Sequence, residues 1–67
     1  MKFQTNTILK DNDEYIIIKD YDKQMDFYIC YCCNKHGTII EKIPYLLKAN
    51  DLKQMKIIKQ TGRVYNE

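Results

Sequence analysis

The stretch DFYICYCCNKH, residues 26–36, contains all three cysteines and the single histidine of this 67-residue chain. After Asp26 its next seven residues are all apolar and rich in aromatic rings, a composition typical of a buried β-strand. Asn34 and Gly37 follow, and both residue types suit a tight turn. The stretch therefore predicts a strand over residues 26–33 and a hairpin turn over residues 34–37.

The segments on either side predict further strands of an antiparallel meander. Residues 2–9, KFQTNTIL, alternate in polarity like a half-buried strand, and residues 14–20, EYIIIKD, are rich in β-branched side chains. Polar residues at 11–13 and 21–25 supply the turns, and residues 38–43, TIIEKI, predict the returning strand. Because parallel pairing needs crossovers of about a dozen residues, these short connections predict antiparallel pairing.

The C-terminal third allows two interpretations. In the first, residues 44–51 form a short helical connection and residues 55–60, MKIIKQ, form a fifth strand, which makes the fold mainly β. In the second, Asp51 caps a helix over residues 52–58 that ends at Gly62. The alternative fold is then α+β, a four-stranded antiparallel sheet covered by a C-terminal helix. We take the mainly β fold as the primary prediction.

Five strands with one short helical turn before the last resemble the SH3-like small barrels over residues 3–60. The EYIII sequence of the second strand is similar to that of small SH3-like proteins from phages and low-GC bacteria. The resemblance implies that the meander closes into a small barrel and that the chain is a binding module, not an enzyme. It rests on element order and includes no family motif, so it assigns no site residues. Frequent Ile, Lys, Asn and Tyr, with Ala49 as the only alanine, resemble proteins of AT-rich genomes.

Length and composition predict one small globular domain. With 45% hydrophobic and 30% charged residues, the chain can form a core, although 67 residues is near the lower limit for folding alone. The net charge is +2, the two signs are interspersed and Arg63 is the only arginine. These features argue against strong or sequence-specific DNA binding. Residues 61–67 are predicted to be a loose tail or a terminal edge.

The location predicted from the sequence is the cytoplasm. The first residues lack the apolar core of a signal peptide, and no apolar run approaches the roughly 20 residues of a membrane span. An odd number of cysteines, two of them adjacent, is a poor framework for disulfides, so a reducing compartment is expected.

One group of residues has the chemistry of a metal or catalytic site. Its members are metal-ligand types with one Cys-x-x-His spacing: Cys30, Cys32, Cys33 and His36. On a strand, Cys30 and Cys32 point to one face and Cys33 to the other, so all four converge only if the strand breaks. No second pair of ligands follows, and no arginine or helix N-terminus lies nearby in the sequence to lower a thiol pKa. We predict no metal, no cofactor and no enzymatic activity, with the cysteines buried as small hydrophobic residues.

The second and third predicted strands are apolar on both faces, which is unusual for an antiparallel sheet in a small monomer. Either closure of the sheet covers the second face, or another molecule does. Six tyrosines add amphipathic rings, and Tyr21 and Tyr45 are expected to point outward. The predicted partner surface consists of Tyr21, Tyr28, Tyr31, Tyr45, Lys19, Lys23 and Lys48.

These observations predict a non-enzymatic protein-binding module that dimerises through a sheet face or edge. We expect it to be encoded by a phage or mobile element and to inhibit or regulate a host protein or a defence complex. The alternative is a small barrel that binds single-stranded DNA or RNA, stacking bases on its tyrosines and neutralising phosphates with its lysines. No membrane interaction is predicted.

Overall fold

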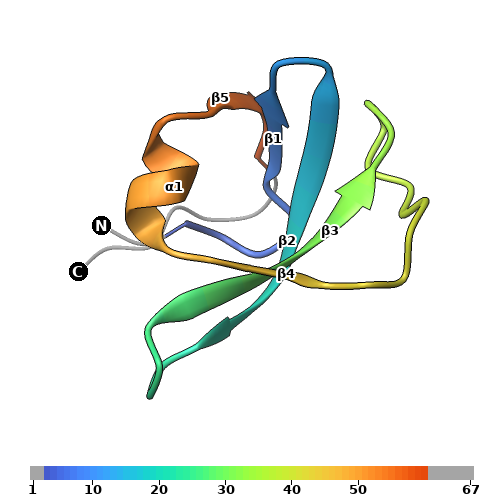
Figure 1. Ribbon diagram of the computed structural model, residues 1–67. Helices are drawn as coiled ribbons and strands as arrows, with labels where there is room; N and C mark the ends of the chain where they lie inside the picture. Colours follow the sequence, from blue (N-terminus) through green and yellow to red (C-terminus); the bar gives the residue numbers. More distant parts are fainter. Residues whose placement is uncertain (1–2, 61–67) are drawn as a thin grey trace.

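The computed structural model describes residues 3–60, in which the apolar segments form five strands and one short helix (Figure 1). The elements are β1 (Ile8–Asp11), β2 (Glu14–Asp22), β3 (Phe27–Cys33), β4 (Tyr45–Leu47), α1 (Ala49–Lys53) and β5 (Lys56–Lys59). All strands belong to one sheet in the order β4-β3-β2-β1-β5, and every neighbouring pair is antiparallel. The mainly β fold and the antiparallel meander are confirmed.

Local turn chemistry explains the first two hairpins. Asn12, in the two-residue turn between β1 and β2, has φ 58°, a left-handed conformation that asparagine tolerates well. In the turn after β2, the Asp22 carboxylate oxygen Oδ1 accepts the backbone N–H groups of Gln24 and Met25 at 3.0 and 3.1 Å. Both turns lie where the sequence predicts them, although β2 extends further, through Tyr21 and Asp22.

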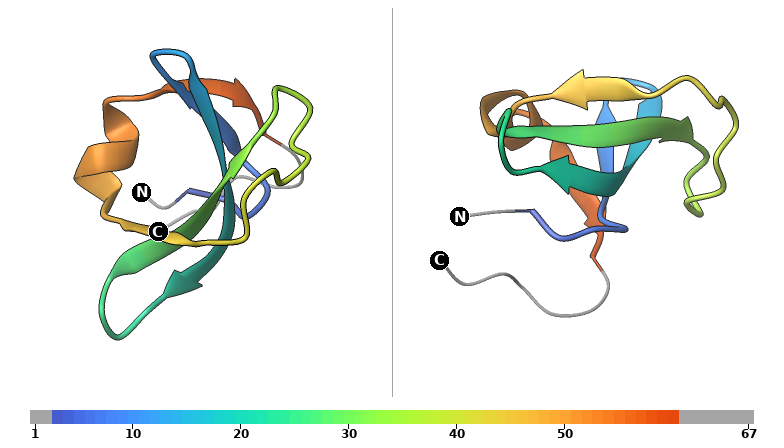
Figure 2. Two further views of the ribbon diagram at one scale, coloured as in Figure 1. Left: turned by 45° about the vertical axis from the view of Figure 1, so that its right-hand side comes forward. Right: turned by 90° about the horizontal axis from the view of Figure 1, so that it is seen from below.

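Strand β2 bends the sheet. The register with β3 shifts between Ile18 and Asp20, so Lys19 is the extra residue of a β-bulge. Figure 2 shows the result, with β1 and β5 lying across the direction of β3 and β4. Within residues 3–60, β4 and β5 are the two edges of the sheet and are not paired with each other. Helix α1 links these edges, and closure of the sheet into a barrel stays a prediction.

Two predicted strands are corrected. The strand predicted over residues 2–9 begins only at Ile8, because the chain turns at Asn6, whose φ is 69°. The strand predicted over residues 38–43 is wrong: it makes a single bridge, between Ile39 and Cys33, and the next strand begins after Pro44. The polarity pattern was compatible with a strand in both places, but a strand also needs a neighbour with which to pair.

The C-terminal third follows the first of its two interpretations. The helical connection is α1, a few residues later than predicted, and β5 pairs with β1 through Leu9 and Ile57. The alternative helix over residues 52–58 is wrong, because α1 ends at Lys53 and the chain returns to the sheet. The four-stranded α+β fold is therefore wrong as well. Gly62 and the predicted tail lie outside the described residues.

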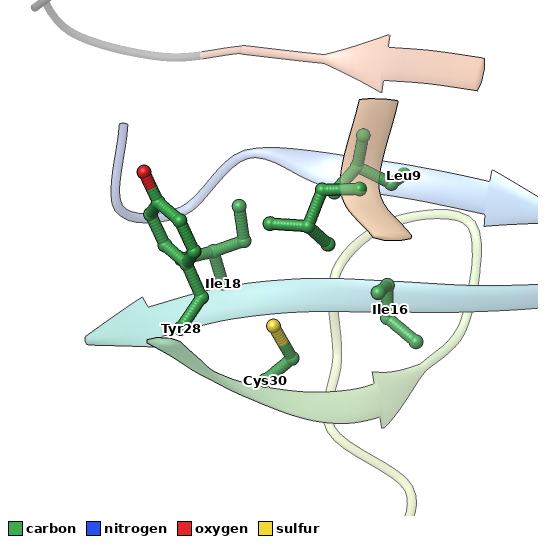
Figure 3. Packing of buried hydrophobic residues seen from close by; sticks show 6 residues of the cluster. Leu9, Ile16, Ile18, Tyr28 and Cys30 are labelled. Atoms are coloured by element: carbon green, nitrogen blue, oxygen red, sulfur yellow. The ribbon is translucent and has the colours of Figure 1, made fainter. Parts of the chain in front are cut away.

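The main core lies between the sheet and α1. It consists of Leu9, Ile16, Ile18, Tyr28, Cys30 and Leu52, five of which are labelled in Figure 3. Leu52 is the buried residue of α1, and it is fully inaccessible to solvent. The Tyr28 hydroxyl accepts the backbone N–H of Phe3 at 3.1 Å, so the buried phenol keeps a hydrogen-bond partner.

A second, smaller cluster covers the opposite face of the sheet. Ile8, Ile17 and Cys33 are buried there, and Tyr15 and Tyr31 pack against them. The turn after β3 passes over this cluster so closely that a Cβ atom placed on Gly37 lies 2.9 Å from Cδ1 of Ile8. Part of the second apolar face of β2 and β3 is therefore covered within one molecule, by the turn after β3, whereas Phe27, Ile29 and Tyr31 on this face are half-buried.

Candidate protein-binding surface

The large apolar side chains left in solvent are concentrated between β3 and the middle of β4. We call residues 39–46 the β4 segment. Five of its eight residues are large and apolar and are exposed by the following fractions: Ile39 38%, Ile40 62%, Ile43 73%, Tyr45 39% and Leu46 57%. The remaining exposed apolar side chains of the described chain are Met25, Ile57 and Ile58.

The path of the chain explains this exposure. The Asn34 side-chain oxygen accepts the N–H groups of His36 and Thr38, at 2.8 and 3.0 Å, and this fixes the turn after β3. Beyond the turn, the Ile40 N–H donates to the Cys32 carbonyl at 3.0 Å, and the chain then leaves the sheet. Figure 1 shows the segment extending beside the end of β3 before it returns as β4.

Strand β4 places its side chains alternately on the two faces of the sheet. Leu46 pairs with Ile29 and is exposed, whereas the next residue, Leu47, pairs with Tyr28 and packs on the main core. Among residues 3–60, no strand pairs with the outer edge of β4. The β4 segment therefore combines exposed apolar side chains with backbone groups of an edge strand, which can pair with another chain.

The β4 segment has one acidic residue, Glu41. The Glu41 carboxylate lies near the Tyr45 hydroxyl, and it is the main reason why the pKa of Tyr45 is raised. The pKa of Cys32 is also raised, chiefly by burial and then by the charges of Glu41 and Glu14. A thiol and a phenol with raised pKa values keep their protons at neutral pH, so neither is activated as a nucleophile.

The other two cysteines are core residues. Burial raises the pKa of Cys30 to about 12 and also raises that of Cys33. Cys30 belongs to the main core and Cys33 to the second cluster, on opposite faces of the sheet. Within residues 3–60, no group of three or more His, Cys, Asp or Glu residues could hold a metal ion. His36 is exposed in the turn that follows.

The structure divides the tyrosines of the predicted partner surface. Tyr28 is only 1% exposed, so its inclusion in that surface is corrected: its ring fills the core. Tyr31 is half-buried against the second cluster. The Tyr21 ring packs 4.7 Å from that of Tyr28, and its hydroxyl donates to Asp26 at 2.6 Å. Of the four tyrosines, Tyr45 alone is exposed.

Two of the three predicted lysines bind within the chain. Lys19 donates to the Asn6 side chain at 3.0 Å, and Lys48 donates to the Met25 carbonyl at 2.9 Å while lying 5.9 Å from the Phe27 ring. Lys23 is exposed in the turn after β2. Tyr45 lies near Glu41, and a partner surface made of the exposed predicted residues stays a prediction.

The sequence analysis missed Ile39, Ile40, Ile43 and Leu46. A signal for them exists: Ile39 and Ile40 are adjacent, so they fall on opposite faces of any strand, and an antiparallel sheet commonly leaves one of its faces in solvent. Pro44 adds to this signal, because it lacks an N–H group and marks an edge strand or a strand's beginning.

A separate hollow of about 290 Å³ lies between β1 and α1. It is lined by Asp11, Leu47, Asp51, Gln54 and Met55. The Asp51 carboxylate accepts the Lys48 N–H at 3.0 Å and so caps α1, which gives this side chain a structural role.

No helix within residues 3–60 has the length and apolar character needed to cross a membrane. Comparisons of the chain with protein-family models, with curated proteins and with solved structures yield no match in any of the three.

Proposed function

We propose that this protein is a non-enzymatic binding module that docks on another protein through the β4 segment. The observation that carries this proposal is the exposure of five large apolar side chains within eight residues, beside an unpaired strand edge. Monomers rarely leave extensive apolar surface in solvent, and where they do, the surface often marks an interaction site.

The architecture supports a small binding module of the SH3-like class. The short helix before the last strand is the arrangement on which that resemblance rests. Helix α1 and its buried Leu52 cover the gap between edge strands β4 and β5, which supports a barrel-like core. In such a protein the fold holds the edge strand β4 and the loop before it in position to bind a partner.

The mode of docking follows from the chemistry of the segment. An extended stretch of the partner can add to the outer edge of β4 by backbone hydrogen bonds, and its apolar side chains can pack on Ile43 and Leu46. Such an addition covers the partner's stretch and blocks its other contacts. The protein therefore acts by occluding a surface.

The nucleic-acid alternative has less support. Lys19 and Lys48 already donate hydrogen bonds within the chain, and the Tyr21 hydroxyl binds Asp26. Stacking of bases needs free aromatic faces beside free cationic groups. A catalytic role likewise lacks an activated group, because the thiol pKa values are raised and not lowered.

Site-specific photo-crosslinking tests the proposed docking surface. We expect a photoreactive residue at position 43 to capture a partner protein in a lysate of the native cell. The same residue at position 35, exposed in the turn after β3, serves as the matched control and should capture none. Equal capture from both positions, or from neither, contradicts docking through the β4 segment.

A further inference from the structure

We infer that the β4 segment also joins two copies of this chain in a two-fold dimer, each copy presenting the same segment to the other. The inference rests on the proposed function, because it uses the same surface, and it names a second copy of the chain as an occupant. In an isologous contact of this kind a surface must be complementary to itself.

The amount of exposed apolar surface matches the requirement of a dimer. At about 200 Å² for a large residue, the exposed fractions of the five residues correspond to roughly 500 Å², which includes their exposed backbone atoms. A standard interface buries about 800 Å² on each partner, of which about 65% is apolar in homodimers. The β4 segment alone thus supplies much of the apolar area that one copy contributes to a standard dimer.

The charges of the β4 segment are compatible with a contact between two copies of the segment. Its charged residues are Glu41 and Lys42, which have opposite signs, so two copies of the segment do not repel each other. The opposite edge of the sheet differs, because in β5 the exposed Ile57 and Ile58 lie between Lys56 and Lys59. Lysines on an edge strand oppose edge-to-edge association. Self-association is therefore directed to the β4 edge.

The experiment measures the mass of the whole chain in solution by sedimentation equilibrium, over roughly 1 to 300 μM, a range that spans weak dimers. We expect a monomer–dimer equilibrium. The substitutions Ile43→Glu and Leu46→Glu should each weaken the dimer at least tenfold. Ile58→Glu makes the same chemical change on the opposite edge and should leave the dimer unchanged, and thermal melting checks that each variant is folded.

Variants with exchanged charges at positions 41 and 42 distinguish a specific dimer from nonspecific association. Lys42→Glu leaves the segment with two negative charges, and Glu41→Lys leaves it with two positive charges. Each variant alone should dimerise more weakly than the wild type. A mixture of the two variants should form a heterodimer, because opposite charges then meet across the contact.

Three outcomes overturn the inference: a wild-type chain that is monomeric throughout the range, a dimer that survives both Ile43→Glu and Leu46→Glu, or charge variants that do not prefer each other. Its failure can be told from that of the proposed function. A monomer whose position 43 crosslinks to another protein contradicts the dimer alone. A dimer whose position 43 crosslinks only to its second copy contradicts docking on another protein alone.

Discussion

Gly37 fixes the position of the turn that covers the second face of the sheet. Its φ is 91°, in a region that side-chain-bearing residues rarely adopt, and a Cβ atom there would crowd the Ile8 side chain. The glycine could be assigned to a turn from the sequence, because Asn and Gly are turn residues. Its contact with Ile8 could not, because the two residues are distant in sequence and meet only when the sheet has formed.

The substitution Gly37→Ala should lower the free energy of unfolding by about 1–3 kcal/mol, because the new side chain is strained by the backbone and crowds Ile8. Urea unfolding followed by circular dichroism measures the loss. His36→Ala, at the neighbouring exposed position, should change the free energy by less than about 0.5 kcal/mol. A Gly37→Ala protein as stable as wild type would show that the turn has room to relax.

Cys30 should make stability depend on alkaline pH. Its pKa is raised from 9.0 to about 12, so the folded chain holds the thiol proton more tightly than the unfolded chain does. The resulting stabilisation is complete below pH 9.0 and is lost as the pH rises towards about 12. Wild-type protein should therefore lose more stability between about pH 8 and pH 10.5 than Cys30→Ala does, as measured by urea midpoints. Equal losses would contradict a role for this thiol.

Helix α1 contributes to the fold mainly through one side chain. Its five residues are too few to be stable alone, and Leu52 is the one among them that is buried. A helical connection is predictable here from Pro44 and Asp51, but its position is not, because Tyr45–Leu47 form β4 before the helix begins. Where α1 begins depends on where Leu52 meets the sheet, which is a long-range contact.

Replacing Leu52 with alanine should cost about 2–5 kcal/mol of unfolding free energy, because it leaves a cavity between the helix and the sheet. Lys53→Ala, the exposed neighbour in the same helix, is the matched control and should be nearly neutral. Thermal melts of both variants test this expectation. Similar melting temperatures for the two variants would mean that the core closes without the helix.

The strands differ in how well the sequence predicts them. Strands β2 and β3 are predictable, because β-branched and aromatic residues fill them and turn residues bound them. The stretch after Gly37 has a similar composition but does not form a strand beyond Ile39. The periodicity of the sequence indicates which faces of a strand are apolar. It does not indicate whether a neighbouring strand is available for pairing.

For the whole molecule, the partition between buried and exposed apolar surface is the least predictable property. The sequence predicts surplus apolar surface on β2 and β3, but the apolar side chains of these two strands are buried or half-buried. The surplus lies instead in the β4 segment, at one edge of the sheet. Composition gives the total amount of apolar surface, whereas its distribution depends on how the chain closes over itself.

The pairing of β5 with β1 joins the two ends of the chain. Leu9 lies opposite Ile57, so most of the sequence separates two neighbouring strands, and α1 must be in position before they meet. Because closing the long loop between these residues costs entropy, we expect this contact to form late in folding. During synthesis β5 is also the last of the five described strands to leave the ribosome. The meander of β1 to β4 must therefore wait, incomplete and with its β1 edge open, until β5 has been synthesised.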